Sequence, residues 1–269
     1  MVLVGSFLTI SLFGVDFKPI IHSGSSQQNS QKRDNSTYKT YSLPEQKSWE
    51  ILKLTPLYSQ LEPLIKKGKI KIKGIKEGGF YILRLITPRG LGNVYITADK
   101  KYTIVGAIVN NKTKQPLQGH FPVNQKVVKE GVLFSFGSGK RDLYLVTDPE
   151  CPYCRIMEKK TKDTLKKEYR VHVILFPLPF HRHARQMSYY ILAAKTDSER
   201  AQRLQKILQG SDEWKNFNPT SKQLEQFEKE LKKSQEAVVE LGARGTPSVY
   251  DDHFQMINWV TLIPHSDQK

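Results

Sequence analysis

The sequence predicts two domains of different class, an α+β domain followed by an α/β domain. Its length of 269 residues suits two domains. Basic residues are unevenly spread, because residues 49–140 hold 16 Lys and Arg against 5 Asp and Glu, whereas residues 141–269 hold 21 against 18. The expected elements also change, from a helix with successive strands to strands that alternate with amphipathic helices.

Composition excludes several classes of protein. Hydrophobic residues make up 38% of the chain and aromatic residues 10%, so a wholly disordered chain is excluded. No apolar run reaches about 18 residues, which excludes a multi-span membrane protein. Two cysteines exclude a disulfide-dense scaffold and a four-cysteine zinc module. The net charge of +16 is typical of proteins that meet nucleic acid, anionic membranes or acidic polypeptides.

The N-terminal segment indicates export. Met1 to Val15 is apolar and uncharged, with the length of a signal-peptide hydrophobic region, although no Lys or Arg precedes it and no A-x-A-like site follows. A buried N-terminal strand is the alternative. We expect residues 1–22 to be a signal peptide or an N-terminal anchor, and residues 23–48 to be a polar linker.

Residues 49–125 predict the α+β domain. Apolar residues up to Lys67 have helical spacing, interrupted by Pro56 and Pro63. Four strands are expected to follow, over 69–73, 79–87, 91–97 and 102–109. A helix with such a thin meander leaves one sheet face to cover, which is typical of a dimerisation domain. The lysines from Lys66 to Lys76 indicate either a solvated strand face or a positive wall that attracts acidic polypeptide.

Residues 126–140 are predicted to be an interdomain linker. They end in Gly137-Ser-Gly-Lys140, which lacks the glycine spacing and the following Ser or Thr of a P-loop.

The candidate catalytic centre is Cys151-Pro-Tyr-Cys154. An apolar run at 143–146 predicts a buried strand, and residues 155–169 predict a helix that begins at the first cysteine. A thiolate at a helix N-terminus has a lowered pKa. We therefore expect Cys151 to be the exposed, attacking thiol, and Cys154, one turn further on, to be shielded and to resolve the mixed disulfide.

Other interpretations of this motif have less support. Zinc would need two further ligands, for which His181 and His183 are the nearest candidates. A structural disulfide across two residues would restrain little of the unfolded chain. Haem attachment would need a histidine where Arg155 stands.

The chain resembles a known family at this point. Asp148-Pro-Glu-Cys-Pro-Tyr-Cys154, with Gly245-Thr-Pro-Ser-Val249 some ninety residues later, is similar to the thioredoxin-fold periplasmic disulfide isomerases of the DsbC/DsbG group. The resemblance implies an α+β N-terminal dimerisation domain and an α/β thioredoxin-like catalytic domain over 141–265. It also implies a cis Thr246–Pro247 bond.

The same resemblance assigns roles to residues and partners. Cys151 and Cys154 would be catalytic, and the substrate would be bound by Pro152, Tyr153, Thr246 and Pro247. No cofactor or metal is expected beyond the redox-active Cys151–Cys154 disulfide. The expected partners are misfolded exported proteins with disulfides, a membrane redox partner and a second copy of the chain, with no nucleic acid.

The remainder of the second domain fits this expectation. Residues 171–176 predict a strand parallel to the first. Met187 to Leu208 and Ser221 to Leu241 predict two helices inserted in the core, before short strands at 249–250 and 254–260. His181 and His183 would lie in a loop, either solvated or in contact with substrate or copper. Thioredoxin has a buried acid where Leu145 stands here, so we expect the resolving thiol to lack a nearby base.

The sequence thus predicts a periplasmic thiol:disulfide oxidoreductase, an isomerase by preference. The alternatives are a dithiol oxidase that introduces disulfides and a periplasmic holdase chaperone with secondary redox activity.

Overall fold

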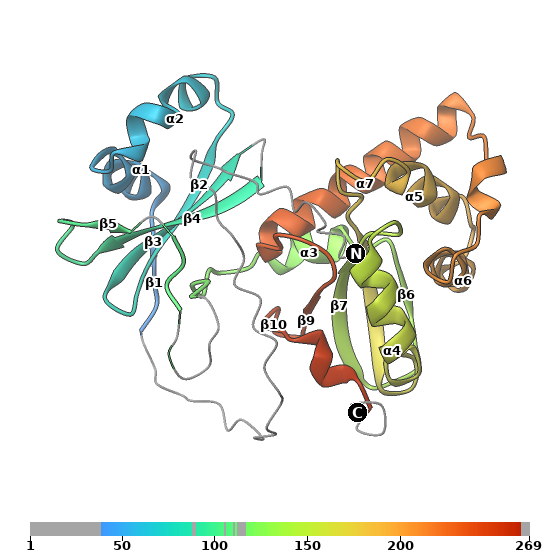
Figure 1. The fold of residues 1–269 in the computed structure, drawn as a ribbon. Helices are drawn as coiled ribbons and strands as arrows, with labels where there is room; N and C mark the ends of the chain where they lie inside the picture. The colour runs from blue at the N-terminus through green and yellow to red at the C-terminus, as the bar shows by residue number, and fades with distance from the viewer. Residues whose placement is uncertain (1–38, 88–89, 105, 110, 112–116, 265–269) are drawn as a thin grey trace, which may run out of the picture. The chain divides into compact units, whose positions relative to one another are not determined.

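The computed structural model describes residues 39–264 except 88–89, 105, 110 and 112–116. Its contacts divide the chain into two units, Met1–Phe121 and Pro122–Lys269, and each is described by itself (Figure 1). The expected signal peptide or anchor lies outside the described residues. Within them, no helix combines the length and the apolar character that crossing a membrane requires.

The first unit is an antiparallel sheet with two helices on one face. Its five strands follow one another in chain order from β1 to β5. The strands are β1 (Tyr41–Leu43), β2 (Lys71–Glu77), β3 (Phe80–Thr87), β4 (Gly90–Thr97) and β5 (Thr103–Ile104). The helices are α1 (Glu45–Lys53) and α2 (Leu57–Lys66).

The helical face of this sheet holds the main core of the first unit. Ile51 and Leu52 of α1 pack with apolar side chains of β2, β3 and β4. The close approach of α1 to the sheet depends on Gly74 in β2. A Cβ at Gly74 would lie 2.3 Å from the Ser48 hydroxyl oxygen, so a larger residue would push the helix away.

The opposite face of the sheet is covered in part by residues 117–121. Phe121 is buried against Ile75, Ile82 and Tyr95. The Tyr95 hydroxyl donates a hydrogen bond to the Leu117 carbonyl at 2.6 Å. Part of the sheet face that the sequence analysis left to be covered is thus covered by the chain itself.

Other differences in the first unit concern boundaries. The expected polar linker 23–48 is wrong at its end, because β1 and the start of α1 lie within it. The expected single helix is two helices, since α1 ends before Pro56 and α2 follows it. Along β2 alternate residues face opposite sides, so Lys71 and Lys73 lie on one face and Lys76 on the other. The lysines of this strand do not form one positive wall.

The second unit is a five-stranded mixed sheet in the order β10-β9-β7-β8-β6. Strands β7 (Arg141–Thr147) and β8 (Tyr169–Leu175) are parallel, as predicted, with Leu145 opposite Val173. The other strands run antiparallel to their neighbours: β6 (Phe134–Phe136), β9 (Ser248–Tyr250) and β10 (Met256–Ile257).

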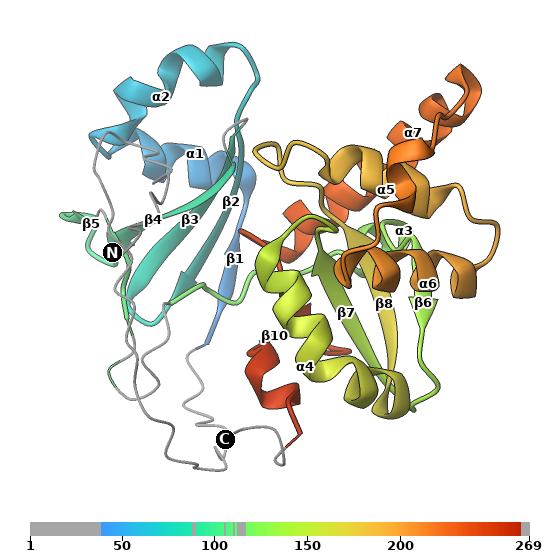
Figure 2. The ribbon, with the colours of Figure 1, turned by 45° about the vertical axis from the view of Figure 1, so that its right-hand side comes forward.

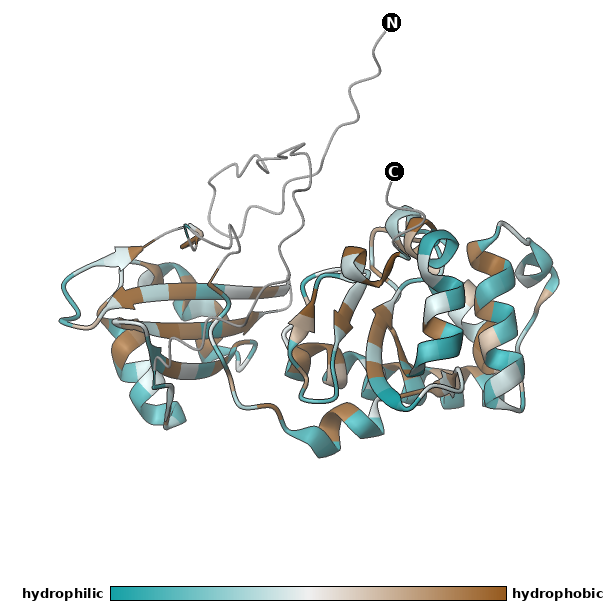
Figure 3. Cartoon of the chain, turned by 90° about the horizontal axis from the view of Figure 1, so that it is seen from below, coloured by the Kyte–Doolittle hydropathy of each residue, from teal (hydrophilic) through white to brown (hydrophobic). Residues whose placement is uncertain are grey.

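Helices cover both faces of this sheet (Figure 2). Leu143 and Leu145 of β7 face a core shared with α4 (Pro152–Glu168), α5 (Ala184–Leu192) and α6 (Asp197–Leu208). Tyr144 and Val146 face the other way, toward α3 (Gln125–Glu130) and the end of α7 (Ser221–Leu241). Figure 3 shows the resulting alternation of apolar and polar residues along the helices and strands.

The helices from α5 to α7 form the insertion between β8 and β9. α6 and α7 each begin with a capping box, in which Thr196 or Thr220 accepts a hydrogen bond from the backbone three residues on. α7 ends at Gly242, which has the left-handed φ of 71° that favours glycine. Two short 3-10 helices complete the unit, at Glu213–Asn216 and Trp259–Leu262.

Two boundaries in the second unit differ from those expected. Residues 126–140 are not an interdomain linker, because they hold most of α3 and all of β6, and β6 pairs with β8. The chain divides before Pro122 instead. The helix expected over 187–208 is two helices, separated at 193–196.

Candidate active site

The two cysteines lie at the junction between β7 and α4: Cys151 precedes the helix and Cys154 is in its first turn. Cys151 is the N-cap of α4 and has an extended backbone, with φ −66° and ψ 124°. Pro152 occupies the first position of the helix, where its missing N–H removes no intrahelical hydrogen bond. The Cys151 N–H donates to the Asp148 carbonyl at 3.1 Å, which closes the turn before the helix.

Both thiols are buried and free in the structure. Cys151 is 3% exposed and Cys154 is 2% exposed, so the prediction that Cys151 is the exposed thiol is wrong. Cys154 lies one helical turn further on, and both cysteines belong to the main core of the unit. The distinction between them is therefore electrostatic rather than one of exposure.

The two thiols have opposite pKa shifts. A hydrogen bond from the Cys154 thiol, with further bonds from Thr246 and the backbone of Tyr153 and Cys154, lowers the pKa of Cys151 to about 5. Burial, followed by the neighbouring Cys151, raises the pKa of Cys154 above its ordinary value. Near neutral pH, Cys151 is thus the thiolate and Cys154 the proton-carrying thiol, as the motif predicts.

A second loop lies against Cys151. The Thr246–Pro247 peptide bond is cis, as the resemblance implied. The Cys151 thiol sulfur is 3.3 Å from the Thr246 carbonyl oxygen, and the two residues are 95 positions apart in the chain. The Thr246 hydroxyl is buried, and it is one of the groups that lower the pKa of Cys151. The structure thus brings together Cys151, Cys154 and the Thr246–Pro247 loop.

Asp148 holds the loop before Cys151 to the loop after β8. It is fully buried and accepts hydrogen bonds from the backbone of Glu150 and Leu178 at 2.8 and 2.7 Å. Its other contact is with the His181 ring nitrogen Nδ1 at 2.8 Å. In the sequence, Asp148 was noted as the first residue of the motif that ends at Cys154, and no structural role was predicted for it. An acid directly after an apolar strand and before the cysteines is the signal that identifies it.

The two histidines of that loop have structural partners. His181 is the partner of Asp148, and the His183 backbone N–H donates to the Glu150 carboxylate at 2.7 Å. The His183 ring packs on Trp214, with centroids 5.2 Å apart. Across the part of the chain that the structure describes, no three His, Cys, Asp or Glu side chains are grouped to hold a metal ion.

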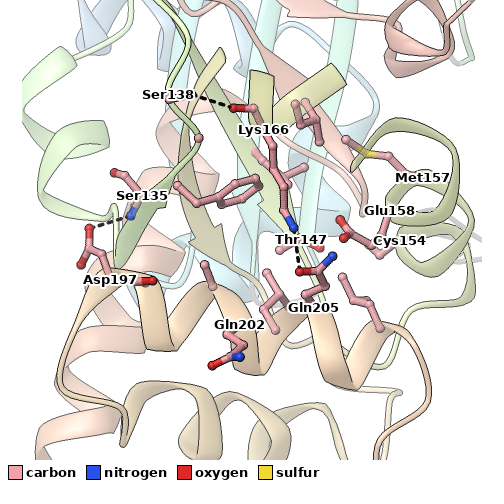
Figure 4. Close-up of a pocket in the computed structure, with 18 residues that line it drawn as sticks. Ser135, Ser138, Thr147, Cys154, Met157, Glu158, Lys166, Asp197, Gln202 and Gln205 are labelled. Carbon is pink, nitrogen blue, oxygen red and sulfur yellow. Dashed lines mark hydrogen bonds between the residues drawn. The ribbon is translucent and has the colours of Figure 1, made fainter. Parts of the chain in front are cut away.

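A cavity of about 730 Å³ lies beside Cys154 (Figure 4). Its walls come from β6, β7, α4 and α6. Leu145 and Thr147 of β7 line it together with Cys154 and Glu158 of α4. Glu158 is half-buried, and burial raises its pKa above the ordinary value. The strand position thus holds Leu145, and the carboxylate that lines the same cavity as the resolving thiol is Glu158 of α4.

This combination defines a class of protein. A thiolate at a helix start, a second cysteine one turn inside and a cis-proline loop against the first sulfur form a thiol–disulfide oxidoreductase-like site. Residues 136–250 match the family model of a thioredoxin-like domain. The chain therefore has an N-terminal antiparallel β-sheet domain and a C-terminal thioredoxin-like α/β domain with a helical insertion.

Several solved structures are similar to this chain. Helicobacter pylori DsbG is 16% identical, with 71% of this chain and 98% of that chain covered and a TM-score of 0.35. Proteus mirabilis ScsC in a transitional conformation is 19% identical, with coverage of 51% and 72% and a TM-score of 0.37. Wolbachia pipientis α-DsbA2 is 14% identical, with coverage of 51% and 89% and a TM-score of 0.40. No curated protein matches the chain. Likeness at this level does not identify a reaction.

Proposed function

We propose that the chain catalyses thiol:disulfide interchange and that its main task is to isomerise or reduce incorrect disulfides in exported proteins. One observation carries the proposal. Cys151 has a pKa of about 5, and it lies beside both the Thr246 carbonyl and a second thiol that stays protonated. A thiolate at neutral pH is the nucleophile that disulfide exchange requires.

The reaction begins at Cys151. Its thiolate attacks one sulfur of a substrate disulfide, a Cys151–substrate bond forms, and the other substrate sulfur leaves as a thiolate. In isomerisation, another substrate thiolate then attacks the substrate sulfur of this mixed disulfide and releases Cys151, with no net transfer of electrons. In reduction, Cys154 loses its proton and attacks the Cys151 sulfur. The substrate leaves reduced by two electrons, and the protein holds the Cys151–Cys154 disulfide.

Residues around Cys151 would bind the substrate chain. Pro152 and Tyr153 lie at the start of α4, and Thr246 and Pro247 form the facing loop. Tyr153 is 56% exposed, and Phe180, beside the Asp148-bound His181, is 68% exposed. Exposed aromatic side chains near the thiols favour a partner with apolar segments, which is what a misfolded protein presents.

A dithiol oxidase is the second candidate, because the low pKa of Cys151 itself favours it. A stabilised thiolate stabilises the reduced form of the pair, which makes the corresponding disulfide a stronger oxidant. A holdase chaperone with secondary redox activity remains the third. In all three cases we propose export to the periplasm and a membrane redox partner that resets the pair.

Refolding of a disulfide-bonded ribonuclease distinguishes these functions. An isomerase restores activity to the scrambled, oxidised ribonuclease without added oxidant, whereas an oxidase acts on the reduced ribonuclease and leaves the scrambled form unchanged. The Cys151→Ser variant should lose either activity. If Cys151→Ser restores ribonuclease as well as the wild type does, the redox proposal fails, and suppression of aggregation by both proteins then supports the holdase.

We also propose that the first unit joins two copies of the chain. Its sheet ends in two short strands, β1 and β5, at which a second sheet can pair. Two catalytic units on one dimer would hold a misfolded chain while its disulfides rearrange. Light scattering of the full chain should give a dimer, and the chain from Pro122 onward should be a monomer that exchanges disulfides but isomerises poorly. A monomeric full chain contradicts this proposal.

A further inference from the structure

The cavity beside Cys154 carries an inference about the second half of the reaction. Cys154 and Glu158 are four residues apart on α4, so their side chains lie on the same face of the helix, one turn apart. Both line the cavity, and Figure 4 shows them at the same side of it as Thr147. The inference rests on the proposed thiol:disulfide interchange.

Cys154 needs a proton acceptor before it can attack. Burial and the neighbouring Cys151 raise its pKa, so at neutral pH the sulfur keeps its proton. The thiol, rather than the thiolate, is a poor nucleophile. Because Cys154 is almost completely shielded from bulk solvent, the cavity is the route by which a base reaches it.

Leu145 shows that β7 does not supply this base. Its side chain points into the same cavity, since it lines the wall together with Cys154. It is apolar and buried, and cannot accept a proton. The carboxylate comes from the helix that carries the cysteines.

The surroundings of Glu158 suit a proton acceptor. Burial raises its pKa toward neutrality, while Lys166, Lys162 and a hydrogen bond with Gln205 act in the opposite direction. Asp163 adds to the upward shift, and Asp197 lies further along the cavity wall. The Lys166 ammonium also donates to Gln205 at 2.9 Å, so that Gln205 links it to Glu158. Glu158 is thus a carboxylate of raised basicity held inside the cavity.

We propose that Glu158 accepts the Cys154 proton, through water in the cavity, during the resolving step. The proton moves from the Cys154 sulfur to a Glu158 oxygen. The Cys154 electron pair then forms the bond to the Cys151 sulfur, the bond from Cys151 to the substrate breaks, and the substrate sulfur leaves as a thiolate. Glu158 later returns the proton to solvent, so the carboxylate is regenerated. A cavity of this size has room for the water that this relay needs.

The test measures the two steps separately in the full chain. A reduced protein is mixed with a fluorescent peptide disulfide in a single turnover. Formation of the mixed disulfide reports attack by Cys151, and release of the peptide reports resolution by Cys154. In Glu158→Gln we expect resolution at pH 7 to slow by about 10- to 100-fold, the low end of general-base effects, with the first step unchanged. The difference in resolution rate between Glu158→Gln and the wild type should disappear toward pH 9, where hydroxide can accept the Cys154 proton in place of the carboxylate.

Two further variants isolate the proton transfer. Glu158→Asp keeps a carboxylate and should recover part of the rate with a shifted pH profile. Lys160→Gln removes a charge from an exposed position of the same helix and should leave both steps unchanged.

Three outcomes overturn the proposal. The first is a Glu158→Gln resolution rate equal to that of the wild type at every pH. The second is an equal slowing of both steps, which indicates a structural role. The third is faster resolution, which indicates that the carboxylate only repels the Cys154 thiolate. If the wild type itself forms no mixed disulfide, the proposed function fails instead.

Discussion

The low pKa of Cys151 makes the reduced protein lose stability on acidification. The free thiol has a pKa of about 8.5, whereas the folded value is about 5. Because the folded pKa is the lower one, the thiolate stabilises the folded state fully above the unfolded pKa. This contribution is lost as the pH falls through the folded pKa.

The size of this effect follows from the two pKa values. The full difference corresponds to about 5 kcal/mol above pH 8.5. At pH 7 the contribution is about 3 kcal/mol, and at pH 5 it is below about 0.5 kcal/mol. The reduced protein should therefore lose about 2 kcal/mol from Cys151 alone between pH 7 and pH 5.

The measurement compares reduced wild type with reduced Cys151→Ser by urea unfolding at several pH values. Other titrating groups are present in both proteins, so they largely cancel in the difference. Cys154 does not contribute in this range, because its raised pKa keeps it protonated in the folded and unfolded states. Oxidised wild type has no Cys151 thiol and serves as the second control. A difference between wild type and variant that stays constant from pH 7 to pH 5 would refute the assignment of Cys151 as a stabilised thiolate.

Three further predictions concern groups around this site. Thr246→Val should raise the pKa of Cys151 by about one unit, the size of one hydrogen bond to a charged group, in a titration of thiolate absorbance, whereas Thr246→Ser should not. Asp148→Ala should lower the free energy of unfolding by about 3 kcal/mol in urea, because three donors lose their acceptor. Gly139→Ala should cost about 2 kcal/mol or more by the same measurement, since its Cβ would lie 1.9 Å from a backbone carbon at the end of α4. Gly245→Ala, whose Cβ meets open space, should cost far less.

Features that depend on a local sequence pattern could be predicted from the sequence. The two-cysteine motif after an apolar run predicted the helix start at Cys151 from local pattern alone. The loop at Thr246–Pro247 was expected from the resemblance to the disulfide isomerases, because a Thr-Pro dipeptide by itself does not show what it faces. The parallel pairing of β7 and β8 followed from the predicted helix between the two strands.

Features that depend on tertiary packing were missed. Tyr41–Leu43 looks like part of a polar linker, yet it pairs with β2 and becomes a strand. Phe134–Phe136 is short and precedes a glycine, and only its pairing with β8 makes it part of the sheet. In the sequence, Glu158 is one of many charged residues on a helix that is expected to be solvated. Its position in a cavity becomes visible only when α6 is placed beside α4.

The walls of the cavity beside Cys154 come from different parts of the fold than the surroundings of Cys151. Attack by Cys151 and resolution by Cys154 can therefore be altered separately by substitution. Cys151 and the Thr246 loop belong to the part of the fold proposed to bind substrate, whereas Gln205 and Leu208 reach the cavity from α6, in the insertion. Substitutions on that face of α6 would alter the surroundings of Cys154 without changing the contacts of Cys151. Under the proposed function, the insertion would offer a separate control over how long a mixed disulfide lasts, and this lifetime would determine whether a bound chain has time to rearrange before it is released.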